Sequence, residues 1–203
     1  MKNDIPLFDA IYTQRALRRF NNDPISDSVV EKLIEAATKA PSGSNKQQWG
    51  FVVVRDHGTR ERIGAYYLRA WTEVFGHGSN TLSPRIKASA EHLGHHMADA
   101  PVLVFACIPH LGTSNLTLGA SIYPAVQNFL LAARAMGIGS VLTTLHKRYE
   151  VEIKELLNIP DNVETVALLP LGYPADGEGY GPTRRRPVSE VIHWEKWTSE
   201  TYS

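Results

Sequence analysis

The chain has 203 residues, enough for one domain of ordinary size with a substantial hydrophobic core. Apolar residues make up 43% and charged residues 21%, and 21 basic residues balance 21 acidic ones, which argues against a module that binds nucleic acid or anionic lipid. The single cysteine, Cys107, excludes an internal disulfide and lies in an apolar run, where we expect a small core side chain. We also expect a cytoplasmic protein, because the N-terminus lacks a signal peptide and no window reaches the ~20 apolar residues of a membrane span.

The first half of the chain mixes helical and strand patterns. A first helix is expected from about Leu7 to Leu17, before turn residues at 21–24 interrupt it. Ser26 is a good N-cap for a second helix, whose apolar residues recur at helical spacing as far as Ala37. The elements expected next are a loop at 41–45, a strand at 49–54 and helices at about 59–75 and 84–97.

The second half continues this mixture and ends in an irregular segment. The expected elements are strands at 102–107, 140–144 and 165–171, a long helix at 122–136 and a short one at 151–157. The remainder is rich in proline and glycine, which predicts an extended arm over about 174–203. Interspersed helices and strands indicate a mixed α/β or α+β fold, with one domain over residues 1–203 and one central sheet.

Two groups of arginines, far apart in the sequence, are candidate anion sites. Arg15, Arg18 and Arg19 are spaced so that a helix would place them on one side of a turn. The second group is the triplet 184–186. Guanidinium groups held together repel one another unless an anion neutralises them, and each can bind two phosphate oxygens. Each group alone is more typical of a solvated basic surface or a surface loop, whereas together the two groups could converge on one phosphate.

The loop at 40–51 combines small residues with amide side chains. Small residues let a ligand approach the backbone, and the amides of Asn45 and Gln47 donate and accept hydrogen bonds. Such a loop suits a flat heterocycle edged with carbonyls and ring nitrogens. An ordinary connection between a helix and a strand is the alternative.

Three histidines, His92, His95 and His96, lie within one helical stretch. Histidines at i and i+4 can share a metal ion, but no acidic residue or cysteine with suitable spacing completes such a site, so we expect no metal. Solvated or packed histidines are one reading. A hydrogen bond from His96, or from His95, to a bound ligand is the other.

The order and spacing of several segments resemble the nitroreductase family. Arg-Ala-Leu-Arg-Arg-Phe at 15–20 precedes Ala-Pro-Ser-Gly-Ser-Asn-Lys-Gln-Gln-Trp at 40–49. Further matching segments are 99–102, 127–132, 137–140, 171–175 and 181–187. Together they extend over nearly the whole chain, from about Phe8 to Trp197.

The resemblance implies an α+β fold with a central mixed sheet flanked by helices, in an intertwined homodimer that binds FMN at its interface. Carried over by motif, Arg15, Ala16, Leu17 and Arg18 would hold the phosphate and pyrimidine side of FMN, and Arg184 and Arg185 would reach the phosphate. Pro41, Ser42, Gly43, Asn45 and Gln47 would close over the flavin, partly from the other subunit. Leu142, Thr143, Thr144 and Leu145 would line the isoalloxazine ring, and His96 stands where some members have a flavin-facing lysine.

One departure from the family pattern concerns the phosphate. The family often has Arg-Arg-Ser where this chain has Gln14-Arg15-Ala16, so one guanidinium and one hydroxyl are missing. This leaves open how Arg15, Arg18 and Arg19 share the phosphate.

The implied activity is that of an FMN-dependent NAD(P)H oxidoreductase. Its acceptors would be nitroaromatics, quinones or related small molecules. The glycine fingerprint of a dinucleotide-binding fold is absent, since Gly137 and Gly139 lack a third glycine and a βαβ setting, so donor and acceptor would take turns at one flavin face. We expect no catalytic side chain, and the aromatic segment 66–75 is a candidate substrate lid. The alternative is a non-catalytic flavin carrier or sensor.

Overall fold

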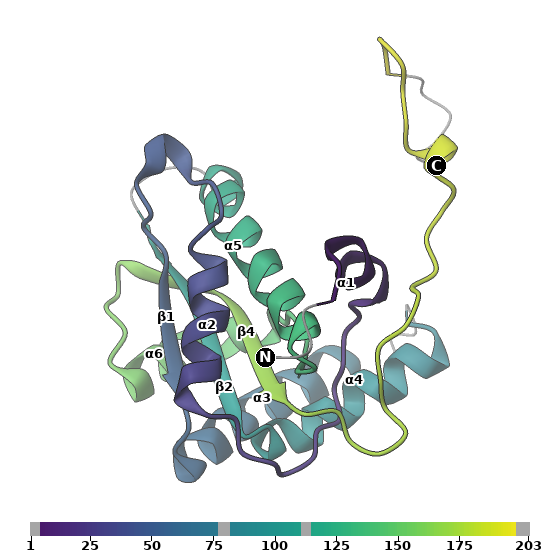
Figure 1. The fold of residues 1–203 in the computed structure, drawn as a ribbon. Coiled ribbons are helices and arrows are strands. Elements are labelled where there is room, and N and C mark those ends of the chain that lie inside the picture. Colours follow the sequence, from purple (N-terminus) through teal and green to yellow (C-terminus); the bar gives the residue numbers. More distant parts are fainter. Residues whose placement is uncertain (1–4, 77–81, 111–114, 198–203) are drawn as a thin grey trace.

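The computed structural model describes residues 5–76, 82–110 and 115–197. Figure 1 shows these residues as one body with a C-terminal segment projecting from it. The helices are α1 (Leu7–Thr13), α2 (Asp27–Ala37), α3 (His57–Phe75), α4 (Pro84–His96), α5 (Asn115–Ala135) and α6 (Glu150–Leu157). The strands are β1 (Gly50–Val54), β2 (Val102–Pro109), β3 (Gly139–Ser140) and β4 (Val163–Gly172), and the short 3-10 turns are η1 (Gly43–Asn45), η2 (Met97–Asp99), η3 (Leu145–Tyr149) and η4 (Val188–Glu190).

The four strands form one sheet in the order β1-β2-β4-β3. All three pairings are antiparallel within the described residues, whereas we expected a mixed sheet. The α+β class and the single sheet with helices around it are confirmed.

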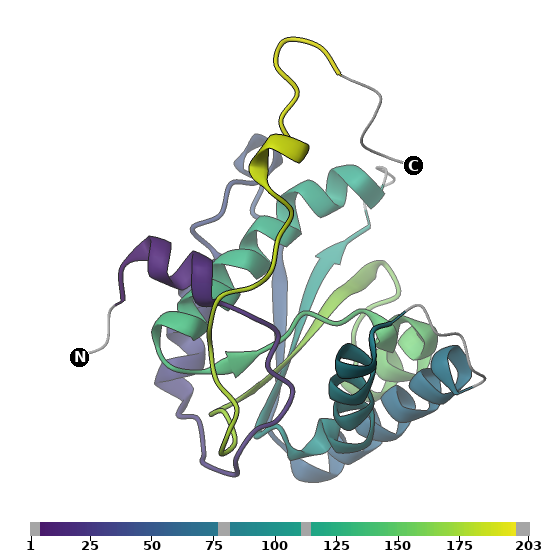
Figure 2. The ribbon, with the colours of Figure 1, turned by 90° about the vertical axis from the view of Figure 1, so that its right-hand side faces the viewer.

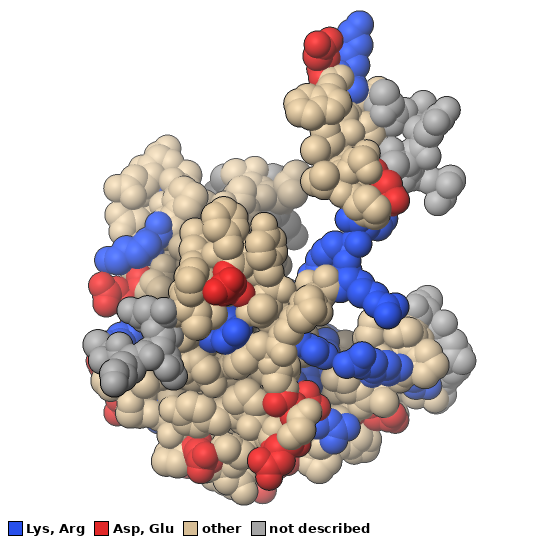
Figure 3. All heavy atoms as spheres, turned by 45° about the vertical axis from the view of Figure 1, so that its right-hand side comes forward, with Lys and Arg blue, Asp and Glu red and all other residues tan. Residues whose placement is uncertain are grey.

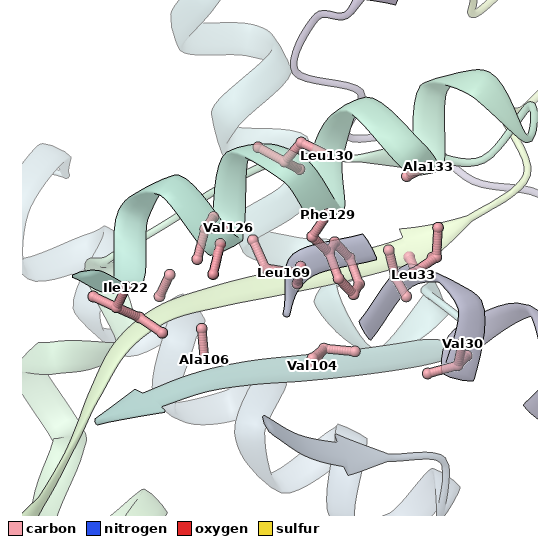
Figure 4. Close-up of a cluster of buried hydrophobic side chains, with 14 of the residues drawn as sticks. Val30, Leu33, Val104, Ala106, Ile122, Val126, Phe129, Leu130, Ala133 and Leu169 are labelled. Carbon is pink, nitrogen blue, oxygen red and sulfur yellow. The ribbon is translucent and has the colours of Figure 1, made fainter. Parts of the chain in front are cut away.

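Side chains of β2 alternate between two cores on opposite faces of the sheet. Val104 and Ala106 pack against α2 and α5, in a core that includes Leu33, Ile122 and Phe129 (Figure 4). Their neighbours in β2 face the other way, into a core built with α3, α4 and α6. Because both faces are covered, β2 is apolar at nearly every position. Cys107 belongs to the second core, as expected for a packed thiol, and burial raises its pKa to about 12.

The first helix ends four residues earlier than the sequence predicts. After Thr13 the backbone is extended at Gln14, and the Leu17 N–H donates to Ser140 O at 3.1 Å. The segment therefore runs beside β3, and the expectation that Arg15, Arg18 and Arg19 share a helical turn is wrong. Leu17 instead pairs with the edge of the sheet and buries its side chain, in place of the last helical turn that the sequence predicts.

Strand β3 is shorter than the expected 140–144, and a proline accounts for this. The register pairs Gly139 with Gly172 and bridges Thr143 to Leu168, which places Val141 opposite Pro170. Proline has no N–H to donate, so the ladder is interrupted there and resumes at Thr143.

Helix α5 corrects one expectation from composition. Its residues Leu116–Ala135 are long and apolar enough to cross a membrane, whereas we expected no such window. Residues on one side of α5, among them Ile122, Phe129 and Ala133, are buried in the core against the sheet and α2. A core helix passes the same test of length and composition, and these contacts are those of a core helix.

The C-terminal arm starts after β4 and follows the surface past α1. Gly181 N–H donates to Thr13 O at 3.1 Å, and Arg134 lies over the Tyr180 ring, with its Cζ 4.1 Å from the centroid. Beyond these contacts the arm projects from the body, as the two ribbon views agree (Figures 1 and 2). The arm expected at about 174–203 thus has this extended form as far as Trp197.

Candidate functional site

Two adjoining cavities lie beside the end of β3. The larger measures about 610 Å³ and the smaller about 540 Å³. Arg18 and Ile86 line both, so the two cavities share part of their wall and together form the candidate site. Of the residues named from the sequence, those that line this site are Arg15, Ala16, Arg18, residues 142–145, Arg184 and Arg185.

The floor of the larger cavity is a free edge of the sheet. Thr143 exchanges two backbone hydrogen bonds with Leu168, at 3.0 and 2.9 Å. In an antiparallel ladder the neighbours of such a residue direct their N–H and C=O groups the opposite way. The N–H and C=O of Leu142 and the N–H of Thr144 therefore point away from β4, whereas the Thr144 C=O accepts from Lys147 N–H at 3.0 Å. Both residues line the cavity. This edge can pair with the polar rim of a planar ligand.

A pair of hydroxyl groups adds to this polar surface. Tyr67 Oη lies 2.8 Å from Thr143 Oγ1, and both residues line the larger cavity. Burial raises the pKa of Tyr67, so its hydroxyl is protonated at neutral pH. Only one of the two hydroxyl hydrogens lies in the bond between these groups. The other can donate a hydrogen bond to a ligand in the cavity.

The smaller cavity is cationic. Arginines from three separate segments line it: Arg15, Arg18, Arg85, Arg184 and Arg185. None of the described residues that line it is Asp or Glu. Figure 3 shows blue side chains where the arm leaves the body and on the surface that faces it. Burial lowers the pKa of Arg18, but a guanidinium stays charged at neutral pH. Such a cavity suits a phosphate group.

Arg19 and Leu17 do not line these cavities. The Arg19 Nε lies 3.4 Å from Glu178 Oε1, and Leu17 is buried in the protein. Arg15 and Arg18 thus remain as the two arginines of the first motif at the site, with Ala16 between them.

The loop expected to cover the ligand lies elsewhere. Gly43 N–H donates to Ser121 Oγ on α5 at 3.1 Å, and Ser42 Oγ accepts from Gln47 N–H at 3.0 Å. Asn45 and Gln47 have positive φ, so this loop has a specific turn conformation. Within this protomer none of the five predicted loop residues lines either cavity: Pro41, Ser42, Gly43, Asn45 and Gln47.

His96 also lies away from both cavities. Its Nδ1 is 2.9 Å from Asp99 Oδ2, and its ring stacks on His92 with the centroids 4.3 Å apart. Burial lowers the pKa of His92. Among the described residues, no group of three or more His, Cys, Asp and Glu side chains could hold a metal ion.

The structure adds lining residues that the motifs did not indicate. Arg85 and Ile86 come from the start of α4, and Lys147 and Arg148 from η3. Because η3 begins at Leu145, the last residue of segment 142–145, the position of its cations could be expected once that segment is recognised. The aromatic segment proposed as a lid does border the larger cavity, through Tyr67, Trp71, Val74 and Phe75.

Comparison with known proteins gives the family of this chain. The model of the nitroreductase family matches residues 11–173. The chain belongs to the nitroreductase family. This match confirms the resemblance seen in the sequence motifs, and it covers the free sheet edge and the first arginine motif.

Individual relatives agree with this assignment. A putative NADH dehydrogenase/NAD(P)H nitroreductase of Archaeoglobus fulgidus is 34% identical, over 92% of this chain and 96% of the relative. The structure of a BluB-like flavoprotein from Clostridium difficile 630 has a TM-score of 0.75 at 26% identity, covering 95% of this chain and all of that one. An NADPH:FMN oxidoreductase from Vibrio harveyi, solved with NAD+, has a TM-score of 0.72 at 23% identity, covering 95% and 78%.

Proposed function

We propose that this protein is an FMN-dependent NAD(P)H oxidoreductase that reduces small organic acceptors. The observation that carries the proposal is the pairing of a cationic cavity with a cavity floored by a free sheet edge. FMN has two corresponding parts: a phosphate group, which suits the cationic cavity, and a planar ring edged with hydrogen-bonding atoms, which suits the sheet edge. The names of the relatives, which include nitroreductases, a flavoprotein and an NADPH:FMN oxidoreductase, supply the same cofactors.

The residues present fit FMN in the following way. Arg15, Arg18, Arg184 and Arg185 would hold the phosphate by charge-assisted hydrogen bonds. The backbone of residues 142–145 and the hydroxyl pair of Tyr67 and Thr143 would bind the polar rim of the ring. When bound, FMN supplies hydride acceptance from NAD(P)H and delivery of electrons to the acceptor. Arg18, which lies between the cavities, would stabilise negative charge that develops on the reduced ring.

The proposal includes a homodimer, because large apolar side chains are exposed at two places in one protomer. Phe8 and Tyr12 of α1 are 64% and 65% exposed, and Trp194 and Trp197 of the arm are 83% and 67% exposed. Burial of such side chains against a second copy would be favourable. The same partner would bring its own loop at 41–47 to the flavin, which accounts for the distance of that loop from the cavities of its own protomer.

A direct test is flavin binding. FMN added to protein freed of flavin should bind with a change in its visible spectrum, at one FMN per protomer, and NADH or NADPH should then support reduction of a quinone or nitroaromatic. Protein that binds FMN without turnover would identify a carrier or sensor instead. Protein that binds no flavin would refute both.

A further inference from the structure

We propose that the larger cavity selects aromatic acceptors that carry a negative charge, such as aromatic carboxylates. This inference rests on the proposed function, since it assigns the acceptor of that same site. It depends on two features of the cavity: an apolar aromatic wall and a cationic corner that one carboxylate does not neutralise.

The wall of the cavity comes from α3 and α4. Trp71 and Phe75 lie one helical turn apart, with their ring centroids separated by 4.4 Å. Val74 and Ile86 extend the same apolar surface. Aromatic rings favour offset or tilted contacts with other rings, so this wall suits a flat aromatic acceptor placed over the sheet edge.

The cationic corner is built around Glu73. Its carboxylate accepts hydrogen bonds from Arg148 Nε, at 2.5 Å, and from the Tyr149 hydroxyl. Arg69 Nε lies 3.6 Å from the same carboxylate, and the Arg69 guanidinium carbon is 5.0 Å from the centre of the Tyr149 ring. These hydrogen bonds lower the pKa of Glu73, which therefore stays ionised. One negative charge thus faces two guanidinium groups, and the corner keeps one net positive charge.

Arg148 presents this charge to the cavity. Its contact with Glu73 uses Nε–H, and a guanidinium carries further donors on its two Nη atoms. Lys147, which also lines the cavity, is different: its Nζ lies 2.6 Å from Glu150 and 3.6 Å from Glu164, so two carboxylates outweigh its one positive charge. None of the described residues that line the larger cavity is Asp or Glu. An anion on the acceptor would therefore meet Arg148 and no lining carboxylate.

The experiment compares 4-nitrobenzoate with 4-nitrobenzamide, which have similar shapes and differ in charge. The measured quantity is the ratio of their kcat/KM values with the FMN-loaded protein and NAD(P)H. Arg148→Gln should lower the ratio of nitrobenzoate to nitrobenzamide about tenfold, because one charge-assisted hydrogen bond is lost. Arg148→Lys should retain much of the preference. Arg62→Gln, an exposed arginine elsewhere on α3, is the matched control and should leave the ratio unchanged. Differences in intrinsic reactivity between the two compounds cancel when variants are compared.

A second measurement does not require turnover. Calorimetric titration with benzoate and benzamide, which lack a nitro group, should show tighter binding of benzoate, and Arg148→Gln should remove the difference. An unchanged kcat/KM ratio in Arg148→Gln would overturn the charge inference while the oxidoreductase proposal stands. If NAD(P)H does not reduce the bound FMN, the proposed function fails, and the titrations alone then decide: equal binding of benzoate and benzamide overturns the inference.

Discussion

The hydroxyl of Tyr67 lies 2.8 Å from Thr143 Oγ1 and so joins α3 to the sheet edge that forms the floor of the larger cavity. Tyr67 is buried, and Thr143 is anchored to Leu168 by two backbone hydrogen bonds. One side-chain contact therefore connects the aromatic wall of the cavity to its polar floor.

Tyr67→Phe and Thr143→Val should each lower the free energy of unfolding by about 1 kcal/mol, because each removes this hydrogen bond. The double variant should lose less than the sum of the two, which urea unfolding of all four proteins would measure. Tyr66→Phe is the control, since Tyr66 instead stacks on Tyr149. Strict additivity would mean that the two hydroxyls contribute independently.

FMN should bind at least tenfold more tightly than riboflavin, which lacks the phosphate. A charge-assisted contact contributes about 1.5–3 kcal/mol, and arginines from separate segments line the smaller cavity. Arg185→Ala should weaken FMN binding, whereas Lys46→Ala, in the exposed loop, should change it less. Quenching of flavin fluorescence measures both comparisons. Equal affinities for FMN and riboflavin would contradict the assignment of the smaller cavity.

The burial of His146 predicts that the folded protein loses stability in acid. His146 is fully buried, its Nε2 lies 2.9 Å from Thr165 O, and burial lowers its pKa to about 4. The unfolded chain, with an ordinary histidine pKa of about 6.5, binds the proton more readily. Its contribution to stability is thus complete above about pH 6.5 and is lost as the pH falls towards 4. Urea unfolding between these values should show a steeper pH dependence for the native protein than for His146→Gln. Identical slopes would show that His146 is not the group responsible.

The arm should be required for assembly and for flavin retention. A chain that ends at Pro187 lacks Trp194 and Trp197, which are largely exposed in one protomer. We expect this truncated protein to be monomeric or aggregated and to lose FMN, as light scattering after size-exclusion chromatography would measure. A well-folded, flavin-loaded monomer would contradict the proposed role of the arm.

The sequence predicts most of the fold, because the apolar patterns of β2, β4 and α5 depend on local periodicity. The misplaced end of α1 has a different origin. Residues 14–17 are compatible with a helix, and the edge of β3, more than a hundred residues away, draws them into an extended form. The early end of β3 likewise depends on Pro170 in the neighbouring strand, which no window around residue 140 contains.

The residues of the candidate site also fall into two groups: those that a local motif predicts and those that depend on the packing of distant segments. Arg15, Arg18 and residues 142–145 could be named from motifs because each motif contributes to the site directly. Arg85 and Arg148 carry no motif, and only the packing of α4 and η3 brings them to the cavities. The loop at 41–47 has the chemistry of a flavin contact, but its place within the protomer depends on its bond to α5.

Steady-state kinetics should be of the ping-pong type. The chain lacks a dinucleotide-binding fingerprint, so NAD(P)H and the acceptor would use the same larger cavity in turn. Rates measured over both substrates, with a quinone as acceptor, should give parallel double-reciprocal lines. Intersecting lines that reflect a ternary complex would require a separate nicotinamide site.

Anaerobic reduction of the bound flavin tests the central claim most directly. FMN-loaded protein mixed with NADH or NADPH in the absence of acceptor should lose its yellow absorption completely, because the donor reaches the flavin without help from a second substrate. Addition of a quinone or nitroaromatic should then restore the oxidised spectrum. If neither nucleotide bleaches the bound flavin, the protein is not an NAD(P)H oxidoreductase, and the site serves flavin binding alone.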